Sequence, residues 1–147
     1  RIGDYKDFPD YHPVLSNDYY INCLNYINSK TNKKIHVMVF YEKKDEKTVF
    51  YKIKIYKRKF PNINFNFVDT EQSDWKQMLL MSCCKHNIVA NSSFSWWSAY
   101  FNDYKDKIVL YPDVYFGKKA VNQDGSLKNT IDLFPSSWIK ITNSKLT

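Results

Sequence analysis

Residues 86–102 read HNIVANSSFSWWSAYFN, and this stretch predicts a strand, a polar turn and a helix in direct succession. The apolar run at residues 86–90 suits a buried strand, residues 91–95 supply the turn, and residues 96–102 begin the helix. A buried strand that leads at once into a helix is the repeating unit of a parallel sheet covered by helices. The stretch therefore predicts an α/β fold.

The rest of the 147-residue chain continues this alternation. Residues 48–60 fit both the period of a strand and the apolar stripe of a helix, and the need for a crossover between parallel strands favours the helix. We expect one Rossmann-like domain over residues 1–147, with a parallel sheet and helices on both faces. The other expected strands are residues 34–41, 64–69 and 107–111, and the other expected helices are residues 17–27 (capped by Ser16), 73–83 and 130–134.

The turn at residues 91–95 is also the first candidate site. In parallel sheets, ligands bind beyond the carboxyl ends of the strands. Three serine hydroxyls in this turn lie where a helix would direct free N–H groups and the positive end of its dipole, which suits an anion. The alternative is a simple helix cap above two core tryptophans, Trp96 and Trp97. The segment by itself supports both interpretations.

Composition argues against several other classes of protein. The net charge is +7, yet of 22 basic residues only Arg1 and Arg58 are arginine. Abundant Lys, Asn, Tyr and Ile indicate an AT-rich genome rather than a nucleic-acid binder, so we interpret the lysines between Lys43 and Lys59 as a solvated face. Three cysteines give no metal-ligand spacing and three glycines allow no glycine-rich phosphate loop. We expect no metal and no cofactor, reduced thiols in a core, and a cytoplasmic location.

Residues 81–100, MSCCKHNIVANSSFSWWSAY, resemble the most distinctive motif of the α-1,2-fucosyltransferases, which use GDP-fucose. Residues 1–5, RIGDY, resemble the end of that family's other hallmark, H-x-R-R-G-D-Y. The similarity continues through residues 111–112, 116–117 and 129–135, so it covers nearly the whole chain. Two motifs in the right order and at about the right separation make a chance match very improbable.

The resemblance implies an inverting, metal-independent transfer of L-fucose from GDP-fucose to a galactoside hydroxyl. It also implies a two-domain GT-B enzyme, of which this chain would be the C-terminal, donor-binding part. Such a part would be inactive alone, and the longer enzyme could lie at the periphery of a membrane. Arg1 would meet the charge that develops on the leaving phosphate, with Asp4 bracing its loop and Trp96 and Trp97 structural near the site. The implied donor and phosphate site comprises Arg1, Gly3, Asn91, Ser92, Ser93 and Phe94.

Some positions depart from the family pattern. Ile2 replaces the second arginine, and Gln77 stands where an acidic residue is often found in the helix before the motif. The general base is expected in the loop after Arg1, where Asp10 is our candidate beside Asp7 and His12, although turn-forming residues of a solvated loop are the alternative. The alternative functions are transfer of another 6-deoxyhexose, or a non-catalytic module that binds a sugar or a nucleotide.

Overall fold

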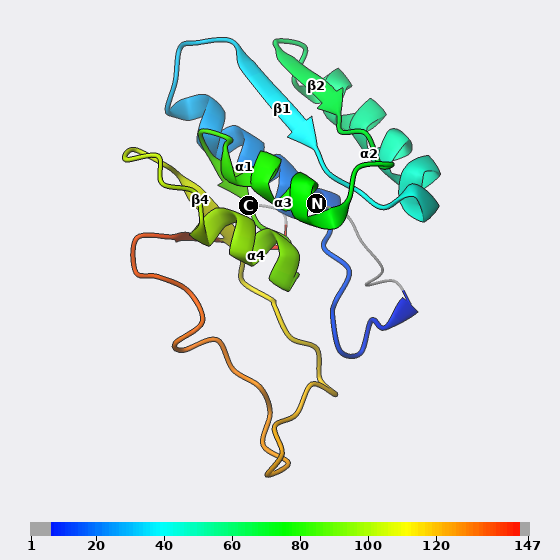
Figure 1. The fold of residues 1–147 in the computed structure, drawn as a ribbon, viewed down its shortest axis with the longest axis vertical. Coiled ribbons are helices and arrows are strands. Elements are labelled where there is room, and N and C mark those ends of the chain that lie inside the picture. Colours follow the sequence, from blue (N-terminus) through cyan, green and yellow to red (C-terminus); the bar gives the residue numbers. More distant parts are fainter. Residues whose placement is uncertain (1–6, 145–147) are drawn as a thin grey trace.

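A computed structural model describes residues 7–144 and shows the expected alternation of strands and helices (Figure 1). The ambiguous stretch at residues 48–60 is helical, because its buried Val49, Ile53 and Tyr56 keep helical spacing. The elements are α1 (Asn17–Ser29), β1 (Ile35–Val39), a 3-10 turn (Lys43–Asp45), α2 (Glu46–Lys59), β2 (Ile63–Phe67), α3 (Asp74–Ser82), β3 (Asn87–Ile88), α4 (Ser93–Tyr100), β4 (Val109–Pro112) and β5 (Ile139–Ile141).

Three details differ from the sequence-based expectations. Helix α4 begins at Ser93 rather than at residue 96, because the serine-rich turn itself supplies the first helical residues. Residues 131–133 form a turn instead of the expected short helix, and β5 follows them as a strand that the sequence did not reveal. A three-residue strand is too short for its period to be read from sequence.

All the paired strands run parallel, as predicted, but they form two sheets rather than one. Strand β1 pairs with β2 from Ile35–Ile63 to Val39–Phe67, and β4 lies between β3 and β5. A cavity of about 190 Å³ separates β1 from β3, and side chains of both strands line it. The structure is therefore a small Rossmann-like α/β fold whose sheet is interrupted between β1 and β3.

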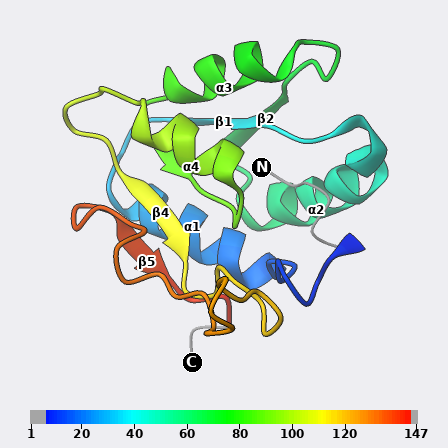
Figure 2. The same cartoon turned by 60° about the horizontal axis from the view of Figure 1, so that its bottom comes forward.

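Helices cover both faces of the strands, as predicted (Figure 2). Leu110 of β4 packs in one hydrophobic cluster with α1, whereas the preceding Val109 packs in another with Ala99 of α4. Successive residues of a strand point to opposite faces, so α1 and α4 lie on opposite sides of β4. In this view α2 and α1 lie below β1 and β2, whereas α3 lies above them and packs beside α4.

Helix α1 packs against both sheets and holds them together. Its cap Ser16 accepts a hydrogen bond from the Tyr19 N–H at 3.1 Å, as the sequence predicted. The side chain of Tyr19 is fully buried, and its hydroxyl donates to the carbonyl oxygen of Val89 at 2.5 Å. Leu24, five residues further along α1, packs with β1 and β2. The position of the β3–α4 turn thus depends on α1.

His86 has a structural role just before β3. Its Nδ1 accepts a hydrogen bond from the Ile108 N–H at 3.0 Å, which joins the start of β3 to the start of β4. Only the neutral imidazole can accept at Nδ1. Burial lowers the pKa of His86, and the charge of Lys85 lowers it further.

We expect the His86→Asn variant to lose less stability on acidification than the wild type. The pKa of His86 is lower in the fold than in the unfolded chain, so its stabilising contribution is present above the unfolded pKa and is lost as pH falls toward the folded pKa. The asparagine Oδ1 can accept from Ile108 N at every pH. Melting temperatures between about pH 7.5 and about pH 5.5 test this, and equal losses in the two proteins would contradict it.

Candidate functional site

The candidate site lies at the carboxyl ends of the strands. The chain leaves β1 toward β2 on one side and leaves β3 toward β4 on the other, so the strand order reverses between β1 and β3. Ligands of open parallel sheets bind outside the carboxyl ends at such a reversal. The cavity between β1 and β3 is a different feature, because mainly apolar side chains line it and none of residues 91–94 does.

The three serines of the β3–α4 turn differ in their hydrogen bonding. Ser95 is fully buried, and its Oγ accepts from the Ala90 N–H and lies within hydrogen-bond distance, 3.1 Å, of the Ser92 carbonyl oxygen. Ser92 is the N-cap residue of α4, yet its side chain makes no capping bond. Within residues 7–144, no hydrogen bond engages the hydroxyls of Ser92 and Ser93. The structure therefore favours Ser95 as the structural serine and leaves the two others open to a ligand.

The N-terminus of α4 adds backbone donors to these hydroxyls. The N–H groups of the first helical turn have no partner within the helix, and the helix dipole is positive at this end. Phe94 lies in this first turn, and its ring packs on the small cluster of Phe40, Val68 and Met81. The turn thus presents hydroxyl and N–H donors without a glycine-rich loop.

The two tryptophans after the turn differ in their environment. Trp96 packs against the core around Val109, and its Nε1 donates to the Leu133 carbonyl oxygen at 2.9 Å. Trp97 is 45% exposed and stacks on Phe101, with ring centroids 5.5 Å apart. The helix-cap alternative, which placed both tryptophans in the core, is therefore wrong for Trp97, because the helical period places it on the outer face of α4.

Residues 7–16, which we call the strap, cross the carboxyl ends of the strands and contact the loops that follow β1, β3, β4 and β5. This arrangement brings the loop after the RIGDY motif to the β3–α4 turn. The contacts are an ion pair of Asp7 with Lys44 (3.6 Å), donation from Lys119 N to Asp10 O (3.0 Å), from Gly117 N to Tyr11 O (2.8 Å), from Asn91 Nδ2 to Pro13 O (2.6 Å) and from Ser16 N to Asn143 Oδ1 (2.9 Å).

Asn91 joins the strap to the β3–α4 turn. Its side chain is fully buried, and the amide nitrogen is used by the bond to Pro13. Among residues 7–144, the amide oxygen has no hydrogen-bond partner. This geometry gives Asn91 a positioning role and leaves an acceptor, rather than a donor, for any group that enters the site.

Asp10 lies on the strap with its carboxylate paired to Lys119. Their Oδ2 and Nζ atoms are 2.6 Å apart, and both side chains are largely exposed. The hydrogen bond with Asp10 raises the pKa of Lys119. Arg1, Gly3 and Asp4 precede the strap and lie outside the described residues.

Gly117 is a site residue that sequence reasoning did not select. A β-carbon at this position would lie 2.1 Å from the Asp10 carbonyl oxygen, so only glycine lets the two backbones approach. The signal was present, because the chain has only three glycines and this one falls in a segment that resembles the fucosyltransferases.

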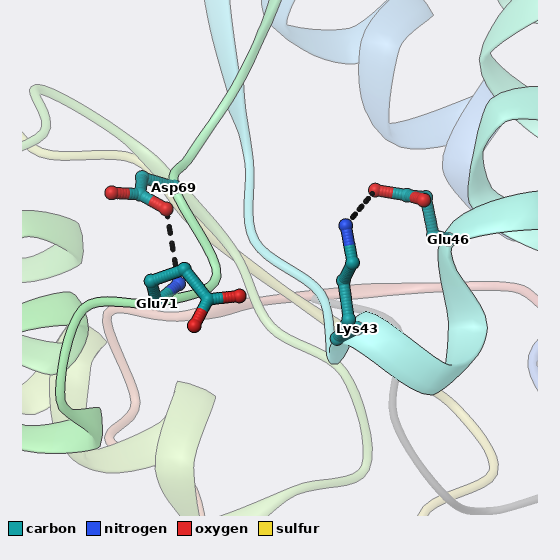
Figure 3. A network of polar contacts seen from close by, with 4 residues as sticks. All are labelled: Lys43, Glu46, Asp69 and Glu71. Carbon is teal, nitrogen blue, oxygen red and sulfur yellow. Dashed lines mark hydrogen bonds and ion pairs between the residues drawn. The ribbon is translucent and has the colours of Figure 1, made fainter.

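Polar side chains after β1 and β2 form one wall of the same edge (Figure 3). Lys43 Nζ lies 2.9 Å from Glu46 Oε1, and this hydrogen bond raises the pKa of Lys43. Asp69 Oδ1 accepts from the Glu71 N–H at 3.0 Å, and this bond lowers the pKa of Asp69. Gln77 is buried and its Nε2 donates to the Gln72 carbonyl oxygen at 2.8 Å. Sequence reasoning did not select Asp69 or Glu71 as site residues.

No group of three or more His, Cys, Asp and Glu side chains within residues 7–144 could hold a metal ion. No helix in the described part is long and apolar enough to cross a membrane. Among the three cysteines, Cys23 is buried while Cys83 is exposed, so the expectation of core thiols is wrong for Cys83.

Comparison with known proteins decides the family. Residues 1–139 match the model of the protein family described as "Glycosyl transferase family 11", which is the family of the fucosyltransferases. The chain belongs to glycosyltransferase family 11. This confirms the resemblance stated from the two motifs, and the match includes the β3–α4 turn, the strap and Gly117.

The chain is also similar to two curated proteins from Escherichia coli. The chain is 34% identical to the O-antigen biosynthesis glycosyltransferase WbnK over 96% of its length, and 31% identical to an alpha-1,2-colitosyltransferase over 96%. It spans 42% and 45% of these proteins, less than half of each. No solved structure matches the chain.

We expect Gly117→Ala to displace the strap. The added methyl group would meet the Asp10 backbone, which cannot move as a flexible side chain can, and overpacking of this kind costs about 1–3 kcal/mol. Amide hydrogen exchange of residues 8–13 should therefore increase, together with a lower melting temperature. Gly125→Asn is the control, because that site has a φ of 82° and open space around it. Unchanged exchange in the Gly117 variant would contradict the clash.

Proposed function

We propose that this protein is the donor-binding part of an inverting glycosyltransferase that transfers L-fucose from GDP-fucose to a galactoside hydroxyl. The observation that carries the proposal is the pair of hydroxyls on Ser92 and Ser93, which stand open at the N-terminus of α4 at the carboxyl edge of the strands. Membership of family 11 supports a nucleotide-sugar donor. The name colitosyltransferase on one relative makes another sugar the alternative donor.

The β3–α4 turn is proposed to bind the phosphates of the donor, and we call it the phosphate seat. When the bond between the sugar and the nucleotide breaks, negative charge builds on the β-phosphate. The hydroxyls of Ser92 and Ser93 can donate to that charge, and the dipole of α4, positive at this end, favours it. Arg1 is proposed to complete the seat as a bidentate cation.

The strap brings the proposed acceptor side to this seat. Asp10 remains our candidate for the base that takes the proton of the acceptor hydroxyl, and Lys119 holds its carboxylate in place. Asn91 fixes the strap to the phosphate seat through Pro13. A base on the strap and a leaving group on the turn would then lie on opposite sides of the sugar, as direct displacement with inversion requires.

The wall after β1 and β2 is proposed to bind the nucleoside. Carboxylates at the end of a strand suit the hydroxyls of a ribose, because a carboxylate accepts hydrogen bonds from both. Asp69 already accepts from Glu71 N and Gln72 Nε2, so Glu71 is our candidate for the ribose contact. A two-domain GT-B enzyme would add the acceptor part, and the share of its relatives that the chain spans supports this proposal.

Serine-to-alanine substitutions test the phosphate seat. We expect Ser92→Ala and Ser93→Ala to keep the wild-type melting temperature, because neither hydroxyl bonds within the described residues, but to slow transfer on the order of a hundredfold. Ser95→Ala should instead lower stability by about 1–3 kcal/mol, because it leaves the buried Ala90 N–H without an acceptor. The measurements are melting curves and transfer rates of the whole enzyme. Stability losses with full activity at positions 92 and 93 would show that they only cap the helix.

Nucleotide selectivity tests the donor. We expect calorimetric titration of the whole enzyme to show tighter binding of GDP than of UDP, with Glu71→Gln weakening both, because the ribose is common to the two nucleotides. Asp106→Asn, at an exposed position in the loop before β4, is the control for the loss of one carboxylate away from the carboxyl ends of the strands. Equal affinity for GDP and UDP would overturn the guanine assignment and leave the family intact.

A further inference from the structure

The outer face of α2 carries an unusual concentration of positive charge. Between Glu46 and Lys59 the helix contains six basic residues and one acidic residue. Six of the exposed side chains recur at helical spacing of i, i+3, i+4, i+7, i+10 and i+11, so they share one side of the helix, which we call the basic face. The basic face consists of Lys47, Phe50, Tyr51, Lys54, Lys57 and Arg58.

The cations of the basic face are not neutralised by the fold. None of the four forms an ion pair in the part of the chain that the structure describes. The acidic residue of the helix, Glu46, is bonded to Lys43. Lys52 lies on the inner side, where its Nζ donates to the Leu15 carbonyl oxygen at 3.3 Å. The charge on the outer side is therefore available to a partner.

Aromatic rings are exposed among these cations. Tyr51 is 67% exposed and Phe50 is 46% exposed, and the Phe50 ring lies 4.6 Å from the ring of Phe67 on β2. The two phenylalanines are among the residues that line an open hollow of about 440 Å³. Its remaining lining is Ile53, Lys54, Lys57 and Arg58.

We propose that the basic face of α2 docks on an anionic lipid bilayer. Lysine-rich surfaces attract anionic headgroups without needing a fixed geometry, and exposed Phe and Tyr insert at the level of those headgroups. Phosphate recognition in nucleic acids favours the arginine fork, and only Arg58 of the four cations is arginine. Figures 1 and 2 place α2 at the outer edge of the fold, so docking leaves the β3–α4 turn uncovered.

Membrane docking is the alternative to our interpretation of these lysines as a solvated face. The proposal does not depend on the identity of the sugar donor. The test is cosedimentation of the purified protein with vesicles of phosphatidylglycerol and phosphatidylcholine, and with vesicles of phosphatidylcholine alone. We expect binding to the anionic vesicles only, with weaker binding at high salt. Lys54→Gln/Lys57→Gln/Arg58→Gln should weaken that binding on the order of a hundredfold.

The matched control removes the same charge elsewhere, as Lys33→Gln/Lys34→Gln/Lys105→Gln, all at exposed positions. This variant should keep binding within about threefold of the wild type, because the net charge contributes less than the local cluster. Phe50→Ala/Tyr51→Ala should weaken the part of the vesicle binding that remains at high salt, because insertion of the aromatic rings does not depend on charge. Equal losses in both triple variants, no binding of the wild type, or binding to single-stranded RNA but not to vesicles would each overturn the proposal.

Discussion

The hydrogen bond from the buried hydroxyl of Tyr19 to the Val89 carbonyl oxygen fixes α1 against the end of β3. The same hydroxyl lies 3.3 Å from the Leu110 carbonyl oxygen of β4, so one side chain reaches two neighbouring strands. Burial raises the pKa of Tyr19 well above its ordinary value, and the hydroxyl therefore stays a donor. Because α1 also packs on β1 and β2, this contact sets both sheets relative to each other, and with them every loop at their carboxyl ends.

That arrangement explains how the candidate site is assembled from distant parts of the chain. The strap runs directly into α1 through the cap Ser16, so an error in the position of α1 would move the strap as well. Asn91 and Gly117 then hold the strap from two sides, one by a side-chain hydrogen bond and the other by the absence of a side chain. The position of the strap thus depends more on the close contact of two backbones at Gly117 and on the hydrogen bond of Asn91 than on ion pairs. The exposed ion pair of Asp10 and Lys119 contributes little to stability.

The β3–α4 turn shows how one short motif separates stability from function. Ser95 completes the backbone hydrogen bonds of the turn and is fully buried, so the turn does not need Ser92 or Ser93 for its shape. A turn that is closed by its own third serine is preorganised, and its open donors need no rearrangement when charge develops on a ligand. Within residues 7–144, Oδ1 of Asn91 is buried without a hydrogen-bond partner. Burying an acceptor in this way costs folding stability.

The sequence by itself determined the alternation of strands and helices, the parallel sheet, the position of the serine turn and the family, because hydrophobic period and an unbroken motif are local properties of the chain. It could not show that β1 and β3 stand apart, that Trp97 faces outward, or that β5 exists, since these depend on packing between distant segments. Only the tertiary structure separated Ser95 from Ser92 and Ser93. Three serines in one turn have the same chemistry in sequence, and burial against Ala90 decides which of them is left for a ligand.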